Sequence, residues 1–195
     1  MNLLLISGFL GSGKTTLLLQ IARHLSADSR KIAIIENEVG QIGIDGQYLR
    51  REGMDVQELF GGCVCCTLSV NLVTTLEKLN RLVHPDTVIL EASGVALPGD
   101  IVPVVRQYAS MVDETQVLLL VDAHRYEMLL EVMNPMMTAH IDAADLVVIN
   151  KIDDVEESKI DHIRKSVQSL NGKARVVALS AEKGINLVAL MRELR

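Results

Sequence analysis

The chain has 195 residues, of which 49% are hydrophobic and 23% are charged, and these proportions exclude an intrinsically disordered or collagen-like chain. Its 19 lysines and arginines against 25 aspartates and glutamates give a net charge of −6, which argues against nucleic acid or an anionic membrane as a partner. No apolar run approaches the roughly 18 to 20 residues of a membrane-spanning helix, and the apolar start lacks the basic region of a signal peptide, so we expect a cytoplasmic protein.

Apolar, β-branched runs alternate with helical patterns along the whole sequence, which predicts an α/β fold of three layers with a mainly parallel central sheet. The predicted strands are 3–7, 31–36, 87–91, 116–122, 146–150 and 175–179, with 56–60 as a further short candidate. The predicted helices are 14–26, 69–83, 100–111, 135–144, 155–169 and 186–194. No repeat or low-complexity linker divides the chain, so we expect residues 1–195 to form one domain.

The first strand runs into a glycine-rich segment with the pattern of a phosphate-binding loop. Residues 8–15 read G-F-L-G-S-G-K-T and lie between a predicted strand and a predicted helix. Backbone N–H groups of such a loop surround phosphate, and the positive end of the helix dipole adds attraction. A lysine at this position contacts the β- and γ-phosphates, and the following hydroxyl reaches Mg²⁺. The predicted phosphate and Mg²⁺ contacts are Gly11, Ser12, Gly13, Lys14, Thr15 and Thr16, with Lys14 in a catalytic role.

Two acidic segments follow the second and third predicted strands. Glu91 ends the strand 87–91 at the place of a Walker-B carboxylate and is the second predicted catalytic residue. Gly94 offers a backbone N–H that can sense the γ-phosphate. Glu36 and Glu38 offer carboxylates at the same edge of the sheet, and Glu38 is a candidate ligand of Mg²⁺ or of a second, transition metal. A solvated acidic loop is the alternative for residues 36–40.

The strand 146–150 ends in Asn150-Lys151-Ile152-Asp153, the N-K-x-D pattern by which P-loop GTPases recognise guanine. A carboxylate at Asp153 can accept the ring N1–H and the exocyclic amino group of guanine, and adenine presents no such pair of donors, so the pattern favours GTP over ATP. Ser180 and Ala181 follow the next strand and resemble the loop whose backbone amide contacts the guanine carbonyl oxygen. Both segments lie at neighbouring strand ends, as a base pocket requires.

The sequence Gly61-Gly62-Cys63-Val64-Cys65-Cys66 places three thiols in four positions, on a loop expected to precede a helix. Such a soft ligand set suits Zn²⁺ or another thiophilic transition metal, and the helix N-terminus favours the thiolate that binds it. A set of small buried side chains and a redox pair at Cys65 and Cys66 are the alternatives. The five histidines form no ligand pair, and we expect them at surface or helix positions rather than as ligands.

These motifs together resemble the GTPase domain of the CobW/HypB/UreG family of metallochaperones, and C-x-C-C at 63–66 resembles its CobW-like branch. The resemblance covers essentially the whole chain through segments 8–16, 36–40, 61–66, 91–94 and 150–153. It implies slow GTP hydrolysis coupled to delivery of a transition metal, with the cysteines as the metal site and nucleotide-driven association of protomers or clients. It also implies that the C-terminal domain of most such proteins is absent from this sequence.

We therefore expect a GTP-dependent metal chaperone or metalloenzyme-maturation factor in which the bound nucleotide gates the cysteine site. Its partners would be GTP or GDP, a transition metal, a client enzyme and a second protomer. The first alternative is a regulatory GTPase that activates a cofactor-dependent enzyme, such as a corrinoid or methyltransferase system, without transferring metal. An adenylate-using kinase is a third class, and the guanine pattern at 150–153 argues against it.

Overall fold

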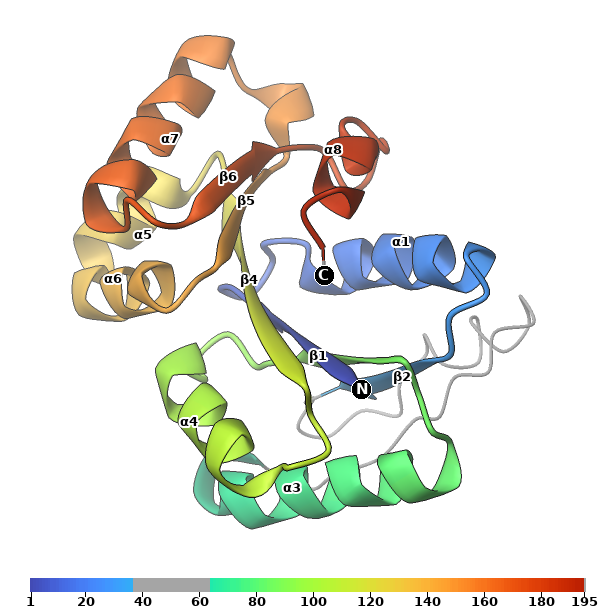
Figure 1. Cartoon of the computed structure of the whole chain (residues 1–195). Helices are drawn as coiled ribbons and strands as arrows, with labels where there is room; N and C mark the ends of the chain where they lie inside the picture. Colours follow the sequence, from blue (N-terminus) through green and yellow to red (C-terminus); the bar gives the residue numbers. More distant parts are fainter. Residues whose placement is uncertain (37–63, 195) are drawn as a thin grey trace.

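Six parallel strands form one sheet at the centre of the molecule (Figure 1), as seen in a computed structural model that describes residues 1–36 and 64–194 and the side chains of 1–35 and 72–194. Every strand pair in the order β2-β3-β1-β4-β5-β6 is parallel, which confirms the predicted α/β class. Parallel pairing fits strands that are apolar on both faces, because helices cover both sides of the sheet. The strands are β1 (Asn2–Ser7), β2 (Ile32–Glu36), β3 (Thr87–Glu91), β4 (Glu114–Asp122), β5 (Leu146–Asn150) and β6 (Arg175–Ala178).

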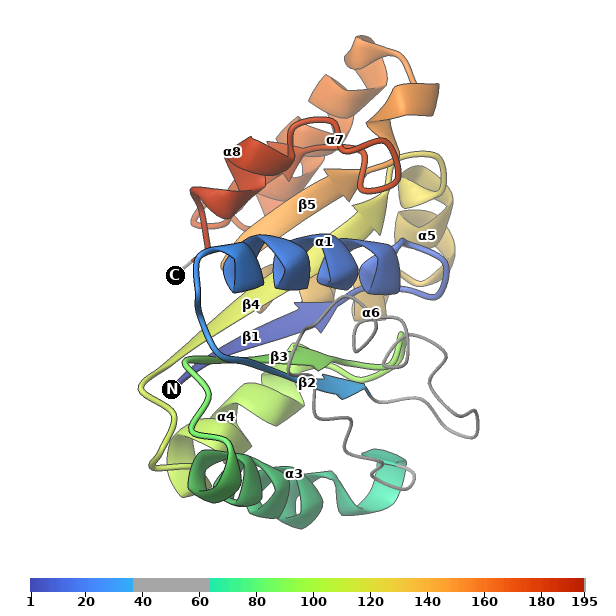
Figure 2. The ribbon, with the colours of Figure 1, turned by 90° about the vertical axis from the view of Figure 1, so that its right-hand side faces the viewer.

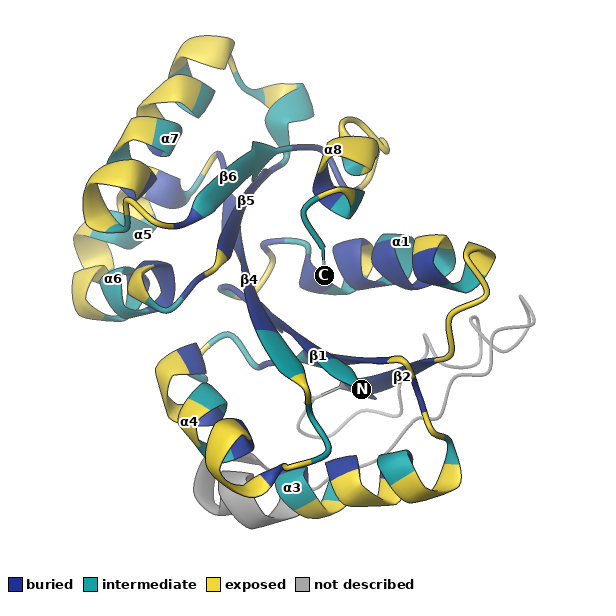
Figure 3. Ribbon diagram, in the orientation of Figure 1, coloured by how far each residue is buried: buried dark blue, intermediate teal, exposed yellow. Residues whose placement is uncertain are grey.

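Helices cover both faces of this sheet, and each face has its own apolar core (Figure 3). Leu4 and Ile6 of β1 pack with α1 and α8 in one core, and Leu3 and Leu5, on the other face of β1, pack with the remaining helices. Alternate residues of one strand thus serve opposite layers. The helices are α1 (Lys14–Ala27), α3 (Val64–Leu82), α4 (Pro98–Tyr108), α5 (Tyr126–Val132), α6 (Asn134–Asp142), α7 (Glu157–Leu170) and α8 (Leu187–Met191), with a 3₁₀ turn at Ile152–Asp154.

The structure differs from the predicted elements at α5 and at the start of α3. The helix α5 was not predicted, although its sequence Y-E-M-L-L-E-V consists largely of good helix formers. The helix α3 begins at Val64 instead of residue 69, so Cys65 and Cys66 lie within a helix and not on the loop before it. The strand candidate 56–60 lies outside the described residues.

Among the described residues, no helix combines the length and the apolar character needed to cross a bilayer. The strand arrowheads point to one side of the molecule, and the loop that precedes α1 lies on that side as well (Figure 2). Open parallel sheets bind their ligands beyond the carboxyl ends of the strands. This edge is therefore where the functional side chains are expected.

Candidate nucleotide site

The loop between β1 and α1 has a backbone that only glycine accommodates at its last position before the helix. Gly13 has a φ of 97°, and a Cβ built there would collide with the side-chain amide nitrogen of Asn150. Lys14 starts the helix and is buried at 7% exposure, and its Nζ donates to the Phe9 carbonyl at 3.4 Å. The Lys14 ammonium therefore lies against the loop that precedes the helix, which is where a phosphate-binding lysine is found.

Thr15 in the first turn of α1 and Glu91 at the end of β3 contact each other. The Thr15 hydroxyl lies 3.2 Å from both carboxylate oxygens of Glu91 and donates to them. Mg²⁺ prefers hard oxygen ligands in this combination of hydroxyl and carboxylate, so the residues present fit the cation. Gly94 lies close to the same loop, because a Cβ built on it would stand 2.9 Å from the backbone nitrogen of Leu10.

Asn150 connects the phosphate loop to the loop after β6. Its side-chain NH₂ donates to the Ser12 carbonyl at 2.8 Å, and its carbonyl oxygen accepts the Ala181 N–H at 2.9 Å. The side chain is 3% exposed, and both ends of its amide are used inside the protein. The Asn150 side chain thus links two predicted site loops through these two hydrogen bonds.

Asp153 is held as a carboxylate by its neighbours. Hydrogen bonds from Ser180 and Lys183 lower the pKa of Asp153 from 3.8 to about 2. The Lys183 ammonium lies 2.9 Å from the carboxylate. An ionised oxygen pair accepts hydrogen bonds and donates none, which is the state that two guanine N–H groups require.

A cavity of about 300 Å³ joins these loops at the carboxyl edge of β5 and β6. This volume is at the lower end of the range for ligand pockets. Glu182, which follows Ala181 in the predicted base loop, also lines the cavity. Sequence reasoning missed His124 and Asp154, which line it too; the His124 ring nitrogen Nε2 lies 3.2 Å from the Asp154 carboxylate. The predicted residues that the cavity brings together are Gly13, Thr16, Asn150, Lys151, Asp153, Ser180 and Ala181.

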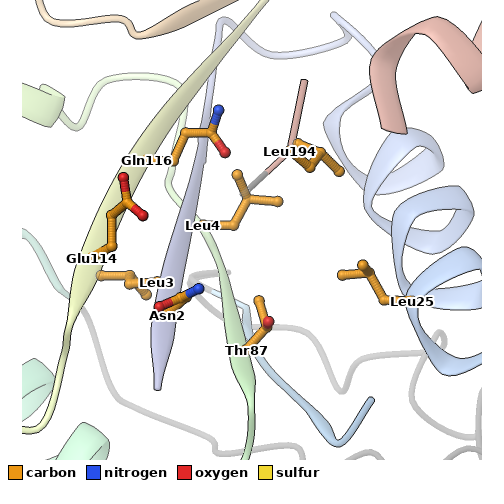
Figure 4. Close-up of a pocket in the computed structure, with 8 residues that line it drawn as sticks. All are labelled: Asn2, Leu3, Leu4, Leu25, Thr87, Glu114, Gln116 and Leu194. Atoms are coloured by element: carbon orange, nitrogen blue, oxygen red, sulfur yellow. The ribbon is translucent and has the colours of Figure 1, made fainter. Parts of the chain in front are cut away.

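A second cavity lies at the opposite, amino edge of the sheet, between β1, β3, β4 and α1 (Figure 4). Its volume of about 10 Å³ is enough for little more than one water molecule. Leucines such as Leu3, Leu25 and Leu194 form much of its wall, and the Gln116 amide beside them donates to the Glu193 carbonyl at 2.9 Å. This cavity does not compete with the carboxyl edge as a ligand site.

Sequence reasoning also missed Asp122 and Arg125 at the end of β4. Asp122 is 3% exposed, and it binds the Lys151 ammonium at 2.8 Å and the Arg125 Nε at 3.0 Å. Burial raises the pKa of Asp122, but hydrogen bonds from Lys151, from the His124 backbone and from Arg125 outweigh it and bring the pKa below 3.8. The available signal was an acid that ends a buried strand next to β1 and precedes a basic pair.

His140 of α6 is a helix residue, as expected, but it is fully buried. Its Nδ1 lies 2.9 Å from the Ser7 hydroxyl, and its ring contacts the Phe9 ring at 5.5 Å between centroids. Burial, together with the charge of Lys14, lowers the pKa of His140 below 6.5, so the ring is neutral. A neutral imidazole therefore packs against Ser7 and Phe9, the residues on either side of the first glycine of the phosphate loop.

Two of the four predicted transition-metal ligands lie outside the described residues, and the other two are described in their backbone alone. Cys63 and Glu38 lie outside the described residues, and Cys65 and Cys66 occupy the first turn of α3. Glu36 ends β2 and stands in register with Glu91 of β3. Within the described residues, no cluster of three histidine, cysteine or acidic side chains could hold a metal ion.

Comparison with known proteins gives one family and a set of curated relatives. The family model described as CobW/HypB/UreG, nucleotide-binding domain, matches residues 2–178. The zinc chaperone CobW of Sinorhizobium sp is 32% identical over an alignment of 216 positions that covers 95% of this chain and 60% of that protein. The zinc chaperone YeiR of Escherichia coli (strain K12) is 34% identical over 151 residues, 76% of this chain and 46% of that protein. The chain spans about half the length of the curated relatives it matches.

Solved structures share the fold over nearly the whole chain. The hydrogenase maturation factor HypB from Archaeoglobus fulgidus has a TM-score of 0.69 at 18% identity, covering 99% of this chain and 89% of its own. The Zn(II)-bound YjiA GTPase from E. coli has a TM-score of 0.64 at 24% identity, covering 92% of this chain and 57% of its own. These likenesses confirm the three-layer P-loop fold.

Proposed function

The chain belongs to the CobW/HypB/UreG family of nucleotide-binding domains, and from that premise we propose that it binds and slowly hydrolyses GTP and couples this to a transition-metal site at Cys63, Cys65 and Cys66. The observation that carries the nucleotide part is the cavity in which the phosphate loop, Asn150 and Asp153 come together. The metal part is supported by relatives named zinc chaperones and by the thiol spacing.

In this proposal the phosphate end of GTP lies on the loop before α1. Lys14 and the N–H groups of Gly11 and Gly13 hold the phosphates, with Ser12 between the two glycines in the same loop, and Gly94 responds to the γ-phosphate. Thr15 and Glu91 hold Mg²⁺, which neutralises charge on the β- and γ-phosphates when bound. The hydroxyl and carboxylate are already 3.2 Å apart, which supports this assignment.

The base end of GTP lies in the cavity beside β5 and β6. Asp153 accepts the two guanine N–H groups, and the Ala181 loop approaches the guanine carbonyl. Lys151 packs along the base, since it follows Asn150 in a left-handed backbone conformation with a φ of 66° and lines the cavity. A low pKa keeps Asp153 charged at every physiological pH, which supports its role as acceptor.

The coupling between nucleotide and metal is proposed to run through the start of α3. Cys65 and Cys66 lie in its first turn. That end of α3 is on the side toward which the strand arrowheads point, the side of the phosphate loop (Figure 2). The bound nucleotide would gate the metal affinity of the cysteines, with Glu38 as an additional ligand. By linkage, the metal must change nucleotide affinity by the same factor.

We place the 195 residues in a single nucleotide-binding domain that works in the cytoplasm. A client enzyme receives the metal, and a second protomer joins when GTP is bound. The client enzyme follows from the chaperone role, because a metal chaperone must deliver its metal to an acceptor.

The test is calorimetric titration of Zn²⁺ into reduced protein loaded with Mg²⁺-GDP or with a Mg²⁺-GTP analogue, with the oligomer mass followed alongside. The control is the triple Cys63/Cys65/Cys66→Ser variant. The rates of GTP hydrolysis and ATP hydrolysis are measured for this variant and for the wild type. The expected result is cysteine-dependent binding whose affinity differs between the two nucleotides. Preference for ATP would overturn the GTPase assignment.

Zinc binding that is absent, or that survives loss of the cysteines, would overturn the metal-chaperone assignment and favour a regulatory GTPase. Nucleotide affinity that zinc leaves unchanged would reject the coupling even if both ligands bind. Proton competition offers an independent check, because thiolate ligands must lose their protons to bind the metal. Zinc affinity should fall as the pH is lowered.

A further inference from the structure

Three consecutive backbone carbonyls of the phosphate loop are held by side chains from outside the loop. The Leu10 carbonyl accepts from Arg125 Nη2 at 2.7 Å and the Gly11 carbonyl from Lys151 Nζ at 2.8 Å. The Ser12 carbonyl accepts from the Asn150 amide at 2.8 Å. Lys151 and Asn150 belong to the guanine-binding motif, whereas Arg125 belongs to the turn after β4, which no motif assigns.

Arg125 is fixed on its other side by a buried carboxylate. Its Nε donates to Asp122 Oδ2 at 3.0 Å, and Lys151 donates to the same oxygen at 2.8 Å. The Asp122 carboxylate also accepts the backbone N–H of His124 at 2.9 Å, which shapes the turn that presents Arg125. Two cations that contact the loop thus share one anchor, and a guanidinium is suited to such a two-sided contact because its donors form a rigid fork.

The contact between Arg125 and Leu10 sets the direction of one N–H group. In a planar trans peptide the C=O and the following N–H point in opposite directions, so a carbonyl held by Arg125 turns the Gly11 N–H away from it. Gly11 permits the close approach, because its φ is 76° and a Cβ built there would stand 3.2 Å from Arg125 Nη2. The Ser12 N–H, by contrast, is used within the loop by the Phe9 carbonyl at 3.1 Å.

We propose that Arg125, anchored on Asp122, is a positioning residue for nucleotide binding that aims the Gly11 N–H at the β-phosphate. The inference rests on the proposed GTP site and adds to it a residue outside the loop and the guanine motif. Arg125 acts through the backbone of Leu10 and Gly11, and its positive charge beside the loop adds to the attraction for phosphate. Its effect is confined to the phosphate end of the nucleotide.

The experiment compares Arg125→Met and Arg125→Lys with the wild type and with Arg106→Met, the same substitution at an exposed arginine of α4. GDP affinity is measured in the presence of Mg²⁺, and the ³¹P spectrum of bound GDP is recorded at saturation. Arg125→Met is expected to weaken GDP binding about tenfold, the size of one charge-assisted hydrogen bond. The β-phosphate resonance should move and the α-phosphate resonance should not.

Arg125→Lys keeps a cation but has one nitrogen to divide between Asp122 and Leu10, so its loss of GDP affinity should be smaller than that of Arg125→Met. It also serves as the test variant if Arg125→Met does not fold. The inference is overturned if Arg125→Met, or Arg125→Lys where Arg125→Met does not fold, binds GDP within about twofold of the wild type. It is also overturned if the β-phosphate resonance of that variant is unchanged, or if Arg106→Met loses as much affinity. A wild-type protein that fails to bind GDP would overturn the proposed function itself, which is a different result.

Discussion

The two ends of the candidate nucleotide site are built in different ways. The phosphate end is a continuous loop of backbone groups whose carbonyls are held by Arg125, Lys151 and Asn150. The base end is a cavity walled by side chains from separate strand ends, with Asp153 paired to Lys183. A backbone site recognises phosphate in any nucleotide, whereas a side-chain site discriminates between bases. Affinity and selectivity are therefore expected to respond to different substitutions.

Lys14→Met should have the largest effect, because it removes the charge that we propose contacts the β- and γ-phosphates. We expect GDP and GTP-analogue affinity to fall by at least about 100-fold. The measurement is fluorescence titration with labelled nucleotides. Lys78→Met, at an exposed lysine of α3, is the matched control and should bind like the wild type. A Lys14→Met protein that still binds tightly would show that the phosphates lie elsewhere.

Asp153→Asn should change selectivity at the base end and leave the phosphate end intact. An asparagine presents one acceptor and one donor group where guanine needs two acceptors, so GDP affinity should fall by about 100-fold. Xanthosine diphosphate, which carries a carbonyl where guanine carries an amino group, should gain affinity. Competition titration with both nucleotides checks this exchange. Asp161→Asn, on the exposed side of α7, should leave the order of the two nucleotides unchanged.

Asn150→Ala should disturb both ends together. It leaves the Ser12 carbonyl and the Ala181 N–H without the partners they have now, and the side chain that it removes is buried. We expect a loss of about 2 kcal/mol in unfolding free energy and about tenfold in GDP affinity. Denaturant unfolding and nucleotide titration measure the two effects separately. Loss of affinity with unchanged stability would mean that Asn150 contacts the nucleotide more than it supports the loops.

The sequence gives a direct prediction for the phosphate end but none for the side chains that hold its carbonyls. Residues 8–15 carry their chemistry in one contiguous pattern, so the loop, Lys14 and Thr15 could be assigned without knowing the fold. Asp122 and Arg125 act through contacts with residues far away in the chain, such as Leu10, and no spacing rule connects them. The predicted start of α3 was wrong for another reason. Cysteine and threonine have modest helix propensity, so the first turn of α3 was expected to be a loop.

The smallest expected effect concerns pH, and it lies at the phosphate end. His140 is buried against Ser7 and Phe9, and its pKa is lowered below 6.5 by burial and by the charge of Lys14. The unfolded chain binds a proton at this histidine near pH 6.5, and the folded chain binds it only at lower pH. His140 therefore makes its full contribution to the unfolding free energy above about pH 6.5, and this contribution falls as the pH drops below that value.

His140→Gln should remove this histidine's share of the acid-induced loss of stability, at a cost of about 1 kcal/mol at neutral pH if the hydrogen bond to Ser7 is not replaced. Denaturant unfolding of the wild type and the variant at several pH values between 7.5 and 5 measures the difference in slope. His162→Gln, at an exposed histidine of α7, is the control substitution. The pKa of Asp153 is about 2, so the base-end carboxylate stays ionised throughout this range. Acid should thus weaken the support of the phosphate loop before it changes base recognition, and equal slopes for His140→Gln and the wild type would contradict that order.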